Sequence, residues 1–356
     1  MDLAFCVDNI RSFDGDKGLS SKQIGVLRGG GKKTVSPIFN KIKSRSFVFF
    51  LLFCISSGLY AQFDPMFSQN MFNHLNTNPG YAGNSGKMNV VLMNRNQWTG
   101  LEGAPVTTVA GADAALNLFG KKVGVGLEVM NDDIGFFNNL MIRLSFARRY
   151  LLGEGELGIG ISTGILSQSF DGSGIEIPES DYHDPNDPMV PSEKISGFAP
   201  DFGLGAFYQG PGWYAGAGVQ HLFSPEPNFQ DDFYVYVHRS LFLTGGYLIN
   251  LEERNFDLEP SIFFRQGGGS WQADLNLNLH FREKYWAGLT YRYQDAVVLL
   301  AGLNLKNGIR AGYSYDITTS KLSNTGSSGS HEIMIGYSFD LNINKKQKRY
   351  KSVRFL

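Results

Sequence analysis

The residues that could do chemistry in this chain are few, and their spacing matches no catalytic motif. Six histidines are scattered among 356 residues, and none belongs to a His-Glu-x-x-His pair of the kind that binds zinc on one helix face. The glycine-rich run over residues 158–164 alternates like a strand, where glycine relieves crowding or allows bending. No nucleophile has a base beside it. The sequence therefore predicts a protein that is not an enzyme and holds no cofactor.

The best candidate for an ion site is a short acidic stretch in the middle of the chain. It supplies four carboxylates, Glu179, Asp181, Asp184 and Asp187. Carboxylate oxygens at short range are the ligands that calcium prefers. Their spacing fits no calcium-binding loop motif, so a solvated acidic loop is the alternative interpretation.

A strict alternation of apolar and polar residues over 271–281 shows which elements position the polar side chains. Only a β-strand places alternate residues on opposite faces. Leu275 and Leu277 would face a core or lipid, whereas Asp274 and Asn276 would face water. The pattern recurs along most of the chain. The candidate strands are 86–98, 104–116, 121–132, 138–150, 155–168, 197–209, 212–222, 238–250, 255–266, 270–281, 284–293, 296–305, 307–316 and 330–341.

The connections between these strands predict a barrel. Most strands exceed the roughly 9–11 residues that cross a bilayer at a tilt. The three longest connections, 169–196, 223–237 and 317–329, each follow an odd-numbered strand. Outer-membrane barrels have long loops outside and short turns in the periplasm. We expect an all-β, transmembrane, antiparallel outer-membrane β-barrel of about 14 strands, with its outer surface in lipid and its interior polar.

Aromatic residues gather near the ends of the predicted strand 284–293. Tyr285, Trp286, Tyr291 and Tyr293 fit the aromatic girdle that such barrels place at the two membrane interfaces. They need no further function.

One apolar run precedes the predicted barrel. Residues 47–59 are shorter than the roughly 18 residues of a membrane-spanning helix, follow a basic flank and end near Ala61, a small residue suited to cleavage. We expect residues 41–61 to be a cleaved signal peptide that directs the chain to the outer membrane of a Gram-negative cell. A membrane anchor is the alternative. Residues 1–40 are then an extension from a wrongly placed start.

Export would remove both cysteines, Cys6 and Cys54. The remaining chain would form no disulfide and no cysteine-based metal site. Residues 62–356 hold 23 Lys and Arg against 29 Asp and Glu, a net charge of −6. This charge argues against a nucleic-acid partner.

The flanks of the barrel region, 86–344, could carry function. Residues 62–85 contain an Asn-Pro-Gly turn and apolar residues at helical spacing. We expect them to form a short helix and turn, a plug-like segment in the periplasmic mouth, with partner binding as the alternative role. Arg95 and Gln97 would face polar groups inside. The basic tail 345–356 would lie in the periplasm, either solvated or docked to a partner.

An ordered set of short motifs runs along the chain. They are residues 64–73 (DPMFSQNMFN), 78–83 (NPGYAG), 94–98 (NRNQW), 103–107 (GAPVT), 312–316 (GYSYD) and 329–333 (GSHEI). Together they resemble the PorP/SprF family of Bacteroidetes outer-membrane proteins, and the resemblance covers essentially all of the chain after residue 61. The matching positions, which become candidate partner contacts, are Asn78, Pro79, Tyr81, Ala82, Gly83, Arg95, Gln97 and Trp98.

The resemblance implies an outer-membrane component of type IX protein secretion and gliding motility. Such a protein assists the export or cell-surface attachment of large secreted proteins with C-terminal sorting domains. Its implied partners are outer-membrane lipid, a secreted adhesin or other cargo, and periplasmic or outer-membrane secretion components.

Two other functions remain open from the sequence. One is an outer-membrane channel for small solutes or lipids. Its pore would be lined by Asp274, Asn276, Asn278, Arg292, Arg310 and Asp316. The other is an outer-membrane hydrolase, for which no sequence signal exists.

Overall fold

A computed structural model describes residues 64–175, 191, 193–229, 235–251, 255–320 and 326–341. Within these ranges the strands form one continuous antiparallel sheet. The strands are β1 (Met88–Asn96), β2 (Val106–Leu118), β3 (Lys121–Ile134), β4 (Phe137–Leu152), β5 (Gly155–Asp171), β6 (Lys194–Gly210), β7 (Trp213–Gln220), β8 (Ser240–Tyr247), β9 (Ile249–Leu251), β10 (Phe256–Gly267), β11 (Ser270–Phe281), β12 (Tyr285–Arg292), β13 (Ala296–Asn304), β14 (Ile309–Thr318) and β15 (Ser330–Phe339).

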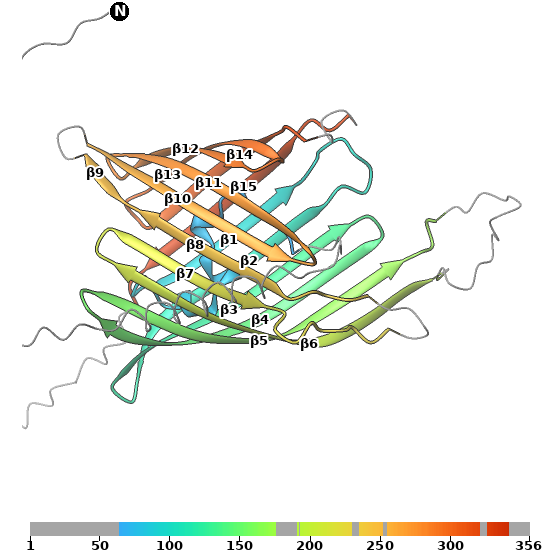
Figure 1. The fold of residues 1–356 in the computed structure, drawn as a ribbon, viewed down its shortest axis with the longest axis horizontal. Helices are drawn as coiled ribbons and strands as arrows, with labels where there is room; N and C mark the ends of the chain where they lie inside the picture. Colours follow the sequence, from blue (N-terminus) through green and yellow to red (C-terminus); the bar gives the residue numbers. More distant parts are fainter. Residues whose placement is uncertain are drawn as a thin grey trace, which may run out of the picture. The chain divides into compact units, whose positions relative to one another are not determined.

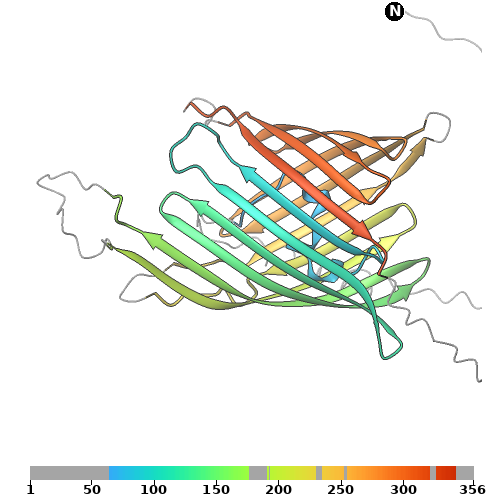
Figure 2. The same cartoon turned by 180° about the vertical axis from the view of Figure 1, so that it is seen from behind.

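The sheet closes on itself. β1 pairs with both β2 and the last strand, β15, and β10 pairs with β11 to complete the ring. β8 and β9 are consecutive along the chain, and both pair with the same edge of β10. Together they occupy a single strand position in the ring. The ring therefore has 14 positions. Figures 1 and 2 show the barrel from two opposite sides. The prediction of an antiparallel barrel of about 14 strands is confirmed.

Alternation in β11 sorts side chains between lipid and interior. Leu275 and Leu277 are 56% and 46% exposed on the outer face, whereas Asp274 and Asn278 are fully buried inside. Apolar side chains lose little on facing lipid, while buried polar groups require partners. The alternation predicted from sequence is the alternation that the strand adopts.

The interior, which the sequence predicts to be polar, also holds part of the chain itself. Three short helices lie inside the ring and appear in blue at its centre in Figures 1 and 2: η1 (Asn70–Phe72), α2 (His74–Thr77) and η2 (Pro79–Tyr81). Around them is an apolar cluster that includes Phe67, Met71, Met93 and Met334. Within the described ranges no helix has the length and apolar character needed to cross a bilayer.

Trp286 belongs to this interior cluster and not to an aromatic girdle. It is 3% exposed and packs against Phe72, with ring centroids 4.8 Å apart. Its neighbour Tyr285 points outward and is 49% exposed. The strand places these two residues on opposite faces, so the girdle prediction was wrong for Trp286.

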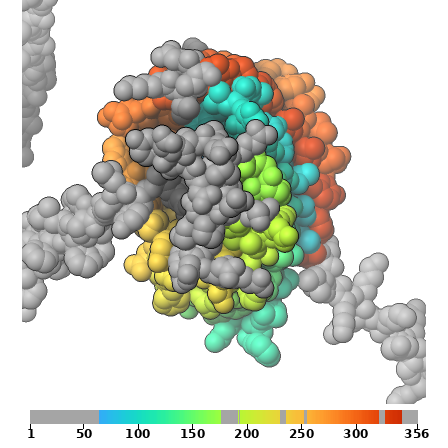
Figure 3. Space-filling model, turned by 90° about the vertical axis from the view of Figure 1, so that its right-hand side faces the viewer, coloured from blue at the N-terminus to red at the C-terminus, as the bar shows by residue number. Residues whose placement is uncertain are grey.

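The two ends of the barrel differ in their connections. Residues 172–193, 221–239 and 319–329 connect strands at one end, which we name the long-loop end. It lies to the right in Figure 1 and faces the viewer in Figure 3. The opposite end, named the short-turn end, has tight turns such as residues 119–120 and 153–154.

Candidate functional site

The candidate site is the barrel interior, where residues 64–85 are held against the wall. We name these residues the N-terminal segment. Its first anchor is Ser68, whose backbone N–H donates to Glu332 Oε2 at 2.7 Å. The next N–H, of Gln69, donates to Glu332 Oε1 at 2.9 Å. One carboxylate from β15 therefore receives two successive backbone donors of the segment.

Buried ion pairs surround this anchor. Arg95 Nη2 lies 2.6 Å from Asp316 Oδ2, and Arg95 Nη1 lies 3.2 Å from Glu332 Oε2. Arg292 contacts Asp274 at 3.2 Å and Asp316 at 2.9 Å. The Ser68 hydroxyl donates to Asp316 at 2.8 Å and accepts from Arg95 at 2.8 Å. Buried charges are tolerated only when paired in this way, so the network links the segment to five strands, β1, β11, β12, β14 and β15.

A second network holds the start of the segment. His221 lies in the loop after β7, and its ring nitrogens contact Asp64 Oδ1 at 2.8 Å and Asp201 Oδ1 at 2.9 Å. Burial would lower the pKa of His221, but the two carboxylates outweigh it and raise the pKa to about 9. As an imidazolium at neutral pH, His221 donates from both nitrogens and bridges the segment to β6. Arg265 also donates to the backbone oxygen of Asp64.

Arg143 connects this network to the middle of the segment. Its Nη1 lies 3.2 Å from Glu128 Oε1 and donates to the backbone oxygen of Asn76 at 3.0 Å. Its Nη2 lies 3.6 Å from Asp201 Oδ2. A guanidinium donates in several directions at once, which suits a junction between two strands and an interior backbone.

Glycines on the inner wall make room for the backbone of the segment. A Cβ added at Gly124 would lie 1.8 Å from the carbonyl oxygen of Ala82. One added at Gly160 would lie 2.4 Å from that of Pro79. We name the five wall positions that approach residues 77–82 in this way the glycine wall: Gly124, Gly158, Gly160, Gly205 and Gly218. Any side chain there would displace the segment.

The Asn-Pro-Gly turn is fitted to this wall. The Asn78 side chain donates to the backbone oxygen of Ala206 at 2.9 Å and accepts from the Gly80 N–H at 2.9 Å. The Tyr81 ring meets Phe207 edge-on at 5.0 Å. Gly83 has a φ of +69°, which favours glycine, and its N–H donates to Asp113 at 2.9 Å.

The structure brings most of the sequence-predicted contact residues together. Residues 78–83 and Arg95 all lie in the interior, in the contacts described above. Gln97 and Trp98 follow β1 at the long-loop end, where their backbone N–H groups donate to Pro105 O at 2.9 Å and Ser330 Oγ at 3.0 Å. Both are half-buried.

The acidic stretch Glu179, Asp181, Asp184 and Asp187 lies outside the described residues. Among those that are described, no group of three His, Cys, Asp or Glu side chains is placed to hold a metal ion.

Sequence reasoning missed several residues of the interior networks. Asp201 and His221 lie in none of the sequence motifs, and Asp64 and Ser68 lie in the motif over 64–73, which does not reveal their partners far along the chain. The inward register of β6 could have identified Asp201, since Asp201 alternates with exposed Phe202. The predicted pore-lining residues Asp274, Arg292 and Asp316 do face inward, but they pair with one another and with the segment.

Cavities remain near both ends of the barrel. One of about 490 Å³ at the short-turn end is bounded by residues 71–75 of the segment and by β1, β14 and β15. Another of about 320 Å³ at the long-loop end is bounded by Asp64, His221 and the ends of β3, β4 and β5.

The closed ring, its lipid-facing leucines and its occupied interior define a transmembrane β-barrel of the outer-membrane type. The family model described as "Type IX secretion system membrane protein PorP/SprF" matches residues 59–337. The chain belongs to this family, and the resemblance seen in the sequence motifs is confirmed.

The chain is also similar to several solved structures, at low identity. The toluene transporter TbuX of Ralstonia pickettii is 12% identical with a TM-score of 0.42, over 74% of this chain and 92% of that one. The monoaromatic hydrocarbon channel CymD is 11% identical with a TM-score of 0.45, over 78% and 93%. BamA of Haemophilus ducreyi, lacking POTRA domains 1–3, is 9% identical with a TM-score of 0.42, over 72% and 70%. No curated protein sequence matched the chain.

Proposed function

We propose that this protein is a closed docking component of type IX secretion in the outer membrane, and not a conduit for its cargo. The observation that carries the proposal is the occupied interior. The N-terminal segment is anchored at Asp64, Ser68, Asn78 and Gly83 by contacts to strands around the ring. A barrel filled in this way offers its loops and turns as binding surfaces.

In this role, the protein would serve the secretion of a large cargo protein with a C-terminal sorting domain, such as an adhesin. The barrel would assist its export or hold it at the cell surface, and in a gliding cell it would support motility. Family membership supports a role in type IX secretion. The docking partners would be other secretion components, in the periplasm or the outer membrane.

A second function, a channel for small solutes or lipids, is favoured by one observation. Cavities of about 490 and 320 Å³ reach the N-terminal segment from the two ends of the barrel. Withdrawal of the segment would join them. The two functions therefore differ in whether the segment leaves the interior.

Two measurements test the docking proposal. The first is conductance of the purified protein in a planar bilayer, where we expect no steady current from the intact barrel. The second compares the surface proteins of a deletion strain with those of the same strain carrying the gene on a plasmid. We expect one or more sorting-domain proteins to disappear from the surface and to return on complementation. Unchanged surface proteins, or a stable open current from the unaltered barrel, would overturn the proposal.

A further inference from the structure

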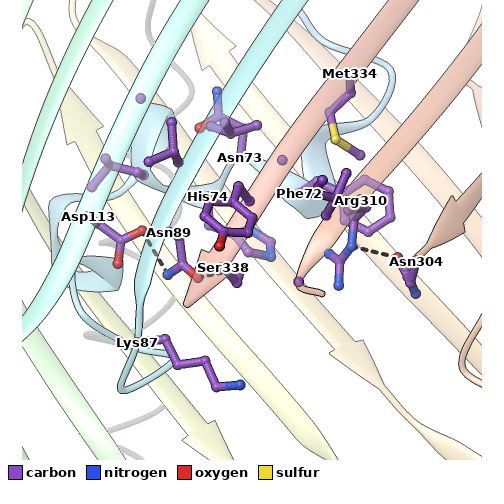
Figure 4. A pocket seen from close by; sticks show the side chains of 18 of the residues that line it. Phe72, Asn73, His74, Lys87, Asn89, Asp113, Asn304, Arg310, Met334 and Ser338 are labelled. Carbon is purple, nitrogen blue, oxygen red and sulfur yellow. Dashed lines mark hydrogen bonds between the residues drawn. The ribbon is translucent and has the colours of Figure 1, made fainter. Parts of the chain in front are cut away.

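The cavity at the short-turn end has the form of a ligand site. We name it the short-turn cavity. Its volume of about 490 Å³ lies within the range of roughly 300–1,000 Å³ typical of ligand pockets. Figure 4 shows residues of the N-terminal segment between two groups of charged and polar side chains.

Two cations of the cavity are available to a ligand. Arg310 lies over the Phe72 ring, with its Cζ 4.7 Å from the centroid, and its Nε donates to Asn304 Oδ1 at 2.9 Å. The terminal guanidinium nitrogens of Arg310 and the ammonium group of Lys87 have no hydrogen-bond partner among the described residues. Stacking and the Asn304 contact hold the guanidinium in place, so its fork is already oriented to receive a carboxylate.

The acids of the cavity do not neutralise these cations directly. Asp113 accepts hydrogen bonds from the Gly83 N–H at 2.9 Å and from Asn89 Nδ2 at 3.1 Å. Glu283 lies in the turn before β12 and lines the cavity, without an ion pair to either cation. An anionic ligand would therefore find an oriented guanidinium and an ammonium group.

Asn73 adds a second kind of recognition. It is only 4% exposed, it lines the cavity, and both its Nδ2 and its Oδ1 lack a hydrogen-bond partner among the described residues. A buried amide left in this state is costly unless something pairs with it. Its neighbour His74, 7% exposed, has an unpartnered Nδ1. Burial lowers the pKa of His74 to about 4, so its ring is neutral at neutral pH.

We propose that the short-turn cavity binds the C-terminal end of an extended peptide. The peptide carboxylate lies on Arg310 and Lys87, and one peptide group pairs with the donor and acceptor of Asn73. A side-chain amide offers the same donor and acceptor pair as a peptide bond, which favours a peptide over a simple anion. The inference rests on the proposed docking role and assigns it a ligand chemistry at this end of the barrel.

The test uses the detergent-purified barrel and fluorescence polarisation of tetra-alanine labelled with fluorescein at its N-terminus. We expect saturable binding of the free-acid peptide and binding about tenfold or more weaker for the same peptide with a C-terminal amide, since a charge-assisted hydrogen bond is lost. Arg310→Gln should weaken binding of the free-acid peptide by a similar factor and leave binding of the amide peptide nearly unchanged. Asn73→Ala should weaken both peptides.

Arg282→Gln is the matched control. Arg282 lies at the same end and over the Phe281 ring at 5.0 Å, as Arg310 lies over Phe72, but it does not line the cavity. Heat-modifiable migration in gels verifies that each variant is a folded barrel. Equal affinity for acid and amide, full affinity in a folded Arg310→Gln barrel, or displacement of the peptide by equimolar inorganic phosphate would overturn the proposal. Because binding is measured without conductance or surface display, this inference can fail while the docking role stands.

Discussion

Glu332 on the last strand accepts a hydrogen bond from the backbone N–H of Ser68 at 2.7 Å, across 264 positions of the chain. Both residues are fully buried. The same carboxylate contacts Arg95 at 3.2 Å. The Glu332 carboxylate therefore joins the N-terminal segment, β1 and β15 at one point.

Replacing Glu332 with glutamine should loosen the N-terminal segment. Glutamine has one acceptor oxygen in place of two and leaves Arg95 with one fewer anion. Breaking one side of a buried pair costs about 3–5 kcal/mol. We expect faster protease cleavage within residues 64–85 and intermittent current in planar bilayers. Glu102→Gln, in the exposed loop after β1, should behave like the unaltered protein. A silent, protease-resistant Glu332→Gln barrel would contradict this view of the anchor.

The glycine wall makes a steric prediction. In Gly124→Ala the new methyl group would lie 1.8 Å from the carbonyl oxygen of Ala82, so the segment must move. We expect a loss of roughly 1–3 kcal/mol in stability, as for other overpacked interiors. Thermal unfolding in detergent measures it. Gly245→Ala is the control, because its nearest contact, Tyr214 O at 3.5 Å, is an ordinary one. Equal melting temperatures for the two variants would argue against close packing of the segment.

Attachment of the segment at Asp64 should depend on pH. The pKa of His221 is raised from 6.5 to about 9 in the folded barrel. The stability that the protonated ring contributes to the folded barrel is therefore fully present below about pH 6.5. This contribution is lost as the pH rises through about 9, and its size is on the order of 3 kcal/mol. Hydrogen exchange of the amides near Asp64, corrected for intrinsic rates, should accelerate from about pH 7 to about pH 10. In the His221→Gln variant the corrected exchange rate should not rise over this pH range. If it still rises, a group other than His221 causes the pH dependence.

Export should leave a defined N-terminus. We expect cleavage after Ala61, so that mass spectrometry of the outer-membrane protein finds Gln62 as its first residue. Ala61→Arg should block cleavage, because the enzyme that removes signal peptides requires a small residue there. Recovery of peptides from residues 1–40 in the outer-membrane protein would contradict both the cleavage site and the proposed start.

The barrel itself could be predicted because its signal is local. Alternation within β11 separates exposed Leu275 from buried Asp274 with no knowledge of partners. Residues 86–98 and 138–150 alternate less cleanly, and the structure gives the reason. Met93 on β1 and Met141 on β4 face inward, where the N-terminal segment provides an apolar surface in place of water.

The interior networks could not be predicted, because closure of the ring decides them. Arg95 meets Asp316 across 221 positions, and nothing near either residue specifies the other. For Gly158 and Gly160, the sequence pattern alone indicates relief of crowding or bending within a strand. The structure places backbone atoms of Pro79 and Gly80 against these two glycines, and these belong to a segment that pattern analysis treats separately. Contacts between regions far apart in sequence carry no periodic signal.

The seam between β1 and β15 has a consequence for biogenesis. β15, the last of the described strands, both pairs with β1 to close the ring and holds Ser68 within it through Glu332. A barrel that closed while empty would have to take in the N-terminal segment afterwards through one of its ends and then form the buried contacts of Ser68. We therefore expect the segment to be enclosed and the ring to be closed in a single assembly event.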